Sequence, residues 1–232
     1  MRFLSRSNFL VLIILVFSTV AIAQTKKERK AKLTNLSTGM YNSTESKEAM
    51  KYYELGVNAA RENDFKGAIK HYKKSLKSDP KFVEAYDNIG VCYRRLGDLK
   101  NAIANYNKSI ELYPQGTMAH MNLGVIYGIQ KEWDKAIAEY KLVQEIDPED
   151  PEGYYGTVNA YMNKGQFKDA IVDATKTLEI YEATESPYVH DAEYLLGLAY
   201  FYDNDLPKAK IYLDMAKKAG VAVPQEIMDK LK

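Results

Sequence analysis

Hydrophobic positions between residues 49 and 223 follow the spacing of amphipathic helices. Tyr86, Ile89, Gly90 and Tyr93 lie three, one and three positions apart, so they share one face of a helix with 3.6 residues per turn. Such a helix cannot bury its apolar face alone. The pattern therefore predicts that it packs against a second helix.

This pattern returns at a constant period, the distance along the chain from Gly56 to Gly90. Small residues, aromatic residues and prolines keep that spacing: Gly56, Gly90 and Gly124; Ala68, Ala102, Ala136 and Ala170; Tyr72, Tyr106 and Tyr140; Pro80, Pro114 and Pro148. Val158 stands in the fourth glycine place, and a fifth unit aligns if Glu185 to Val189 are an insertion. A period of this length predicts a repeat protein. The units are 49–82, 83–116, 117–150, 151–184 and 190–223.

Each recurring residue has a physical role in a pair of helices. A glycine in the apolar stripe, such as Gly90, lets the second helix approach closely, and Ala102 removes a side chain from the facing helix at that contact. We expect Tyr106 to fill the space beside it. Pro114 ends the second helix, because proline lacks a backbone N–H and clashes with the preceding turn.

Short turns separate the two helices of each unit. They read Asn63-Asp64-Phe65, Gly97-Asp98-Leu99, Lys131-Glu132-Trp133, Gly165-Gln166-Phe167 and Asn204-Asp205-Leu206. Glycine, asparagine and aspartate suit such turns, and the apolar residue that follows tucks back into the helix pair. We interpret Trp133 as the anchor of its turn, with stacking on a ligand as the alternative.

These residues resemble the tetratricopeptide repeat. Unit two matches its pattern best, with Tyr86, Ile89-Gly90, Tyr93, Ala102, Tyr106, Ser109 and Pro114 at the expected offsets. The resemblance implies an all-α fold: a right-handed superhelical solenoid of five helix-turn-helix repeats. Residues 224–232 follow as a short cap, in which Ile227, Met228 and Leu231 share one apolar edge.

The resemblance also implies where a ligand binds. In this family the first helix of every unit lines the concave face, and a peptide or helix of another protein lies there. The inward positions supply these candidates: Tyr53, Asp87, Arg94, Met118, Met121, Asn122, Tyr155, Asn159 and Tyr194. Glu84, Glu152 and Asp191 occupy inward positions as well. The inward positions as a whole are rich in methionine, tyrosine and aliphatic residues, with polar groups concentrated in unit two, which suggests an apolar groove. The alternative is that several inward residues pack between helices, above all Val57, Val91, Val125 and Leu198.

One known mode of binding is not expected. Family members that clamp the C-terminal carboxylate of heat-shock chaperones use lysine, asparagine and arginine at five inward places, and these places hold Tyr53, Val57, Val91, Met118 and Asn122 here. Arg94 and Arg95 remain as partners for an acidic group on a ligand.

Residues 1–23 read as a signal peptide. Two arginines precede an apolar run, and Ala21-Ile22-Ala23 forms a small-x-small cleavage site. The run is shorter than the roughly 18 residues that span a bilayer, so cleavage is expected, with an uncleaved membrane anchor as the alternative. Residues 24–48 form a polar, basic leader, read as a solvated spacer; contact with anionic lipid headgroups is the alternative. We expect export to the bacterial periplasm, with secretion or a membrane-anchored form as alternatives.

Composition narrows the function further. Removing residues 1–23 takes away Arg2 and Arg6 and leaves 30 basic against 31 acidic side chains, which gives no support to nucleic-acid binding. Cys92 is the only cysteine, and the three histidines lack metal-ligand spacing, so neither a metal nor another cofactor is expected. No catalytic motif is present. We expect a non-enzymatic protein–protein interaction module, an adaptor or assembly scaffold, with a weakly self-associating structural repeat protein or a membrane-anchored scaffold subunit as the alternative.

Overall fold

The computed structural model of the chain describes residues 44–232, and these residues form helices and turns without a strand. The five antiparallel pairs are α2 (Lys47–Arg61) with α3 (Phe65–Ser78), α4 (Val83–Arg95) with α5 (Leu99–Leu112), α6 (Thr117–Ile129) with α7 (Trp133–Ile146), α8 (Pro151–Lys164) with α9 (Phe167–Ala183), and α10 (Val189–Tyr202) with α11 (Leu206–Lys218). A short α12 (Gln225–Lys230) ends the chain. The expected signal peptide and most of the expected leader lie outside the described residues.

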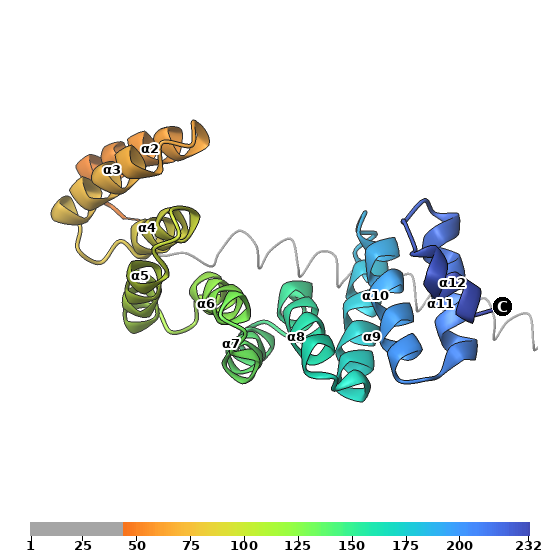
Figure 1. Cartoon of the computed structure of the whole chain (residues 1–232). Helices are drawn as coiled ribbons and strands as arrows, with labels where there is room; N and C mark the ends of the chain where they lie inside the picture. Colours follow the sequence, from red (N-terminus) through yellow and green to blue (C-terminus); the bar gives the residue numbers. More distant parts are fainter. Residues whose placement is uncertain (1–43) are drawn as a thin grey trace, which may run out of the picture.

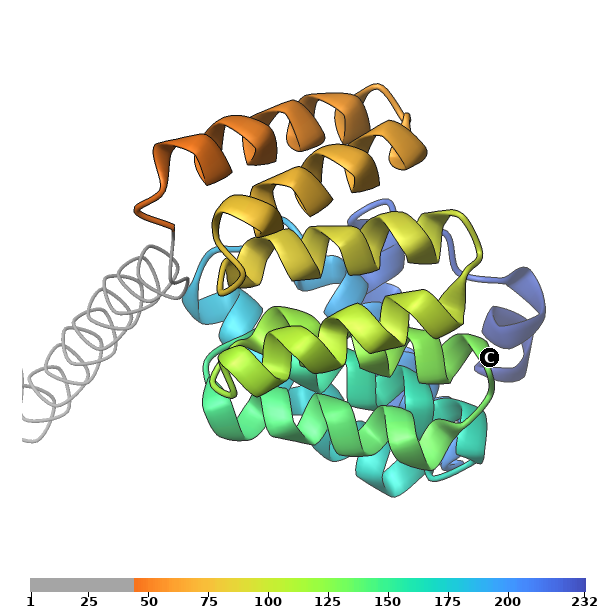
Figure 2. The ribbon, with the colours of Figure 1, turned by 90° about the vertical axis from the view of Figure 1, so that its left-hand side faces the viewer.

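Successive helix pairs pack side by side along the chain. Figure 1 shows a bent row in which α4, α6 and α8 lie on the inner side of the bend and α5 and α7 on the outer side. In Figure 2, turned by 90°, the pairs from α2 and α3 to α6 and α7 stack one below another. The expected all-α solenoid of helix-turn-helix units is confirmed.

Each pair is fitted together by one small and one large residue, which stand at fixed places on the first and the second helix. A Cβ atom added to Gly90 would lie 2.5 Å from Cε1 of Tyr106, and one added to Gly56 would lie 2.5 Å from Cε1 of Tyr72. The tyrosine ring therefore occupies the space directly over the glycine, where the sequence reasoning placed it beside the contact. The recurring alanines are fully buried in all five units: Ala68, Ala102, Ala136, Ala170 and Ala209.

In unit four the larger residue stands on the first helix and the smaller residue on the second. Val158 replaces the glycine, and Ala174 stands where the other units carry a tyrosine or leucine. Both residues are buried in the same cluster. A larger residue on the first helix is thus compensated by a smaller one on the second, which keeps the volume of the interface.

The turn inside each pair uses one left-handed residue. Positive φ angles occur at the same place in every unit, at Asn63, Gly97, Lys131, Gly165 and Asn204. Aspartate follows in three units and caps the second helix: Asp64, Asp98 and Asp205 accept a hydrogen bond from a backbone N–H three residues on. Trp133 opens α7 and packs against the neighbouring cluster of buried residues, as expected for the anchor of a turn.

The recurring prolines set where the second helices end. α3, α5 and α7 each end two residues before Pro80, Pro114 or Pro148. Glu182 takes this place in unit four, and α9 continues to Ala183. The expected insertion from Glu185 to Val189 forms the turn that follows, except that Val189 already starts α10.

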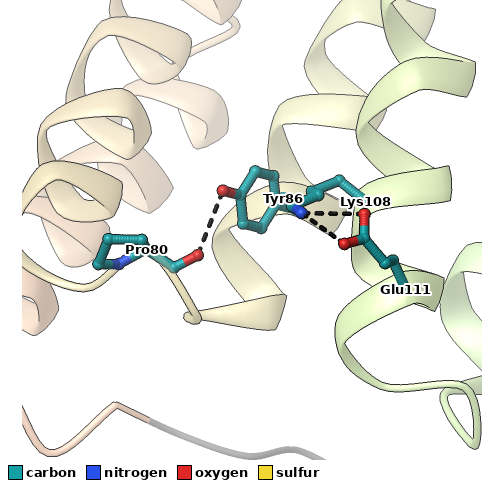
Figure 3. A network of polar contacts seen from close by, with 4 residues as sticks. All are labelled: Pro80, Tyr86, Lys108 and Glu111. Atoms are coloured by element: carbon teal, nitrogen blue, oxygen red, sulfur yellow. Dashed lines mark hydrogen bonds and ion pairs between the residues drawn. The ribbon is translucent and has the colours of Figure 1, made fainter.

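A tyrosine on the first helix fixes the turn between two units. The Tyr86 hydroxyl donates a hydrogen bond to the Pro80 carbonyl at 3.2 Å (Figure 3). The same view shows an ion pair within α5, where the Lys108 amino group donates to both carboxylate oxygens of Glu111 at 2.9 Å. Tyr154 repeats the first contact with the Pro148 carbonyl at 3.3 Å. These bonds hold the start of a first helix against the end of the preceding unit.

The two ends of the array are closed differently. At the C-terminal end Ile227, Met228 and Leu231 are buried against Ala209 and Leu213 of α11, so the short helix covers the last pair as expected. At the other end α2 begins at Lys47, two residues before the expected start of unit one. The Ser46 hydroxyl caps α2 by accepting the Ala49 N–H. Within residues 44–232 no helix is long and apolar enough to cross a membrane.

Candidate binding groove

All of the candidate residues lie on first helices, whose row forms the inner side of the bend. Tyr53 is on α2, Asp87 and Arg94 on α4, Met118, Met121 and Asn122 on α6, Tyr155 and Asn159 on α8, and Tyr194 on α10. Four of them line two hollows: Tyr53, Asp87 and Met118 line the first, and Tyr155 lines the second.

The first hollow has a volume of about 230 Å³. Its lining residues come from α2, α4 and α6: Tyr53, Glu84, Asp87, Asn88, Val91 and Met118. We call it the N-terminal hollow. Asn88 donates an amide hydrogen to the Tyr53 hydroxyl at 2.7 Å, and the Tyr53 ring packs 4.8 Å from that of Phe82. These contacts fix the tyrosine wall of the hollow.

Two carboxyl groups face this hollow in a poorly solvated setting. Asp87 is only 4% exposed, and burial raises its pKa to about 6, against the lowering effect of a hydrogen bond with Ser109. Burial raises the pKa of Glu84 as well. Asp87 Oδ1 and Glu84 Oε2 are both buried and have no hydrogen-bond partner. The hollow therefore combines apolar walls with hydrogen-bond acceptors, and its acidic residues come from unit two.

The inner surface of α6 is apolar and exposed. Met118 and Val125 are each 37% exposed, and Ile129 is 58% exposed. They follow one another at steps of seven and four positions, so they lie along one face of the helix. Met121 is half-buried, and Asn122 is buried with its amide donating to the Met118 carbonyl at 2.9 Å. The Asn122 side chain thus makes its hydrogen bond within its own helix. We call Met118, Val125 and Ile129 the apolar strip.

The second hollow, of about 340 Å³, lies at units four and five. Glu152, Tyr155, Tyr181, Tyr188 and Asp191 line it. Burial raises the pKa of Glu152, and the rings of Tyr181 and Tyr188 lie 6.0 Å apart. We call it the C-terminal hollow.

The remaining candidates lie outside both hollows. Asn159 is exposed, and its amide donates to the Tyr155 carbonyl at 2.9 Å. Tyr194 packs against the buried cluster of α11 and α12. Arg94 is half-buried, with its Nε buried and unpartnered, and its positive charge opposes the burial that raises the pKa of Tyr106 to about 12. Arg94 is therefore packed near the Tyr106 hydroxyl and lines neither hollow.

Three lining residues were missed. Asn88 holds in unit two the place that Asn122, which was chosen, holds in unit three, so strict use of the period would have found it. Tyr181 and Tyr188 belong to the extended end of α9 and to the insertion, and no repeat position points to them. Cys92 is buried, and burial raises its thiol pKa to about 11. Among residues 44–232 no group of three or more metal-ligating side chains is placed to hold an ion.

Comparison with known proteins shows which proteins have a similar architecture. A family model described as tetratricopeptide repeat matches residues 53–117 and 97–151. A solved structure of MamA is 27% identical, covers 76% of this chain and 98% of its own, and has a TM-score of 0.63. MamA from residue 41 onward, from Desulfovibrio magneticus RS-1, gives 19% identity, coverage of 75% and 96%, and a TM-score of 0.65.

A further structural neighbour carries a description of its binding site. YrrB, described as a tetratricopeptide-repeat protein with an unusual peptide-binding site, is 22% identical, with coverage of 74% and 86% and a TM-score of 0.60. Similarity at this level shows the fold. No curated protein matches the chain.

Proposed function

We infer that this chain is a tetratricopeptide-repeat protein, and we propose that it binds a segment of another polypeptide along the inner side of its helix row. It acts as an adaptor or assembly scaffold and not as an enzyme. The array offers two hollows and an exposed apolar strip between them, and this arrangement suits a ligand that is longer than one pocket.

The apolar strip is the observation that carries the proposal. Met118, Val125 and Ile129 are exposed in a row on the middle first helix of the array, and a hollow with hydrogen-bonding groups lies to either side. Burial of such a strip by a partner is favourable, while the polar groups of the hollows fix the orientation of the bound segment. YrrB is described as having a peptide-binding site, and the same class of ligand fits the side chains here.

The sequence of residues 1–23 supports a proposal for where the protein acts. We propose an extracytoplasmic location, the periplasm of a bacterium, with contact to a membrane only if the apolar segment is retained. Weak self-association stays a prediction of the same kind. Light scattering at several concentrations tests it, because a monomer mass that does not change with concentration rules self-association out.

The binding proposal is tested with peptides. A random peptide library is panned against the full chain, and the affinity of selected peptides is then measured for a Val125→Ser, Ile129→Ser variant. Val125 is 37% and Ile129 58% exposed, and thermal unfolding of the variant shows whether the helices remain intact. We expect a loss of roughly tenfold or more in affinity, since two apolar contacts are removed.

The matched control removes a valine and an isoleucine that are exposed on second helices. Val172 on α9 is 67% exposed and Ile211 on α11 is 56% exposed. A Val172→Ser, Ile211→Ser variant is expected to bind the selected peptides with unchanged affinity. The proposal is wrong if the control pair reduces binding and the α6 pair does not. The affinity of the selected peptides is also measured for a variant with Tyr53, Met121 and Tyr155 changed to alanine. This variant extends the test to the neighbouring inner positions.

A further inference from the structure

The N-terminal hollow contains two carboxyl groups that the folded chain leaves without a cation. Within residues 44–232 no ion pair within 4.0 Å involves Glu84 or Asp87, and each has one buried oxygen without a hydrogen-bond partner. An unpartnered buried acceptor costs free energy, and a native structure keeps few of them. Both oxygens are covered in the unliganded chain, so a ligand that supplies hydrogen-bond donors removes that cost once the two side chains turn toward it.

The repeat itself does not require the buried acid. The place of Asp87 is taken by Tyr53, Met121, Tyr155 and Tyr194 in the other four units, and all of these units fold as helix pairs. Asp87 is thus a feature of one unit and one hollow. The Ser109 side chain, on the facing helix α5, is near enough to oppose the rise in the pKa of this carboxyl by hydrogen bonding.

The walls of the hollow match one kind of side chain. Val91, Met118 and the Tyr53 ring supply apolar surface, and Glu84 and Asp87 supply the acceptors. Lysine and arginine combine an apolar stem with a charged head that only donates hydrogen bonds. An acidic side chain would meet two carboxyl groups and be repelled, and a purely apolar one would leave both acceptors unpaired.

We propose that the N-terminal hollow receives a lysine or arginine side chain of the bound polypeptide, with Asp87 and Glu84 accepting hydrogen bonds from its charged head. This inference rests on the proposed function, and it adds a fixed register: one basic residue of the ligand sits between α2, α4 and α6, and the apolar residues beside it cover the strip on α6.

The experiment combines changes in the ligand and in the protein. Selected peptides are resynthesised with each lysine replaced by norleucine and each arginine by citrulline, and their affinities are measured for the full chain and for Asp87→Asn and Glu84→Gln variants. We expect one basic position whose replacement weakens binding to the natural chain about tenfold or more, as for a charge-assisted hydrogen bond. The same replacement is expected to cost less than about twofold in Asp87→Asn.

Controls separate the charge from the fold. Asparagine keeps the shape of aspartate, and thermal unfolding of the variant shows whether the helices remain intact. Glu145→Gln removes an exposed carboxyl on α7, and it is expected to leave the penalty for replacing the basic residue unchanged. A peptide of residues 24–36, which carries the basic cluster of the leader, is measured alongside.

The outcomes distinguish the two proposals. Peptides that depend on Val125 and Ile129 but have no basic position coupled to Asp87 overturn this inference and leave the proposed function standing. Peptides that do not depend on Val125 and Ile129 overturn the proposed function and this inference with it. If the peptide of residues 24–36 binds and the selected peptides do not, the occupant is a segment of this chain, and the assignment to a partner is wrong.

Discussion

The ring of Tyr106 lies directly against the backbone of Gly90, so that a Cβ atom at position 90 would come within 2.5 Å of Cε1 and 2.7 Å of Cζ. Tyr106 is fully buried, and its ring has no room to retreat without disturbing the pair α4 and α5. This contact, and its equivalents in the neighbouring units, sets how closely the two helices of a unit approach.

We expect Gly90→Ala to destabilise the chain by about 1–2 kcal/mol. The added methyl group overpacks the interface, and the better helix propensity of alanine offsets only part of the cost. Chemical denaturation followed by circular dichroism measures the change. An unchanged or higher free energy of unfolding would show that the ring moves aside freely.

Unit four suggests a compensating pair of changes. Tyr106→Ala alone leaves a cavity and is expected to cost about 3–5 kcal/mol. Adding Gly90→Val reproduces the combination of Val158 and Ala174, so the double variant should lose less than the sum of the two single variants. A coupling energy of about 1 kcal/mol or more in the double-mutant cycle supports the size exchange, and strict additivity would refute it.

Lys131 carries a left-handed backbone that other units assign to glycine or asparagine. Its φ angle is 61°, and that of Gly165 at the same place in unit four is 73°. We expect Lys131→Gly to stabilise the chain by roughly 0.5–1 kcal/mol, because glycine adopts this conformation without a steric penalty. Gly165→Ala is the opposite control and should destabilise by a similar amount. Melting temperatures that move in the same direction for both variants would contradict this explanation.

The raised pKa of Asp87 predicts a stability that falls as the pH rises. Burial raises the folded-state pKa to about 6 from 3.8. The folded chain therefore binds more protons between these values, and stability decreases as pH rises through this window. Asp87→Asn removes the effect, so the variant should gain stability over the natural chain by at most roughly 3 kcal/mol near neutral pH, and by much less near pH 4.

Melting curves of the two proteins at both pH values test this prediction. Comparison with the variant isolates Asp87, since Glu84 and the other acids titrate in both proteins. If the melting temperatures of the two proteins differ by the same amount at neutral and at acidic pH, folding does not raise the pKa of Asp87.

The regular part of the fold could be predicted because one period fixes it. Gly90, Ala102, Tyr106 and Pro114 each return at the same spacing, and each marks a helix contact or a helix end in the structure. Periodicity fails where the repeat is interrupted. Tyr188 lines the C-terminal hollow from an insertion that has no counterpart in the other units.

The site was harder to predict than the fold for a physical reason. The position of a residue within the repeat predicts which way its side chain points. It does not predict which neighbouring residues cover that side chain. Asp87 was expected on the inner side, yet its burial and its unpartnered oxygen depend on α2 and α6 as well as on α4. Asn122 and Arg94 occupy inward positions too, but the first bonds its own helix and the second packs near Tyr106.

The central claim is that a polypeptide binds along the inner side of the helix row. Its most direct test is methyl NMR of the full chain labelled at its methionines, titrated with a selected peptide. Met118 and Met121 lie on α6 at the inner side, and Met215 is exposed on the second helix α11. The claim predicts that the signals of Met118 and Met121 shift as the peptide is added while that of Met215 stays in place. A shift of Met215 with no change at Met118 and Met121 would contradict it.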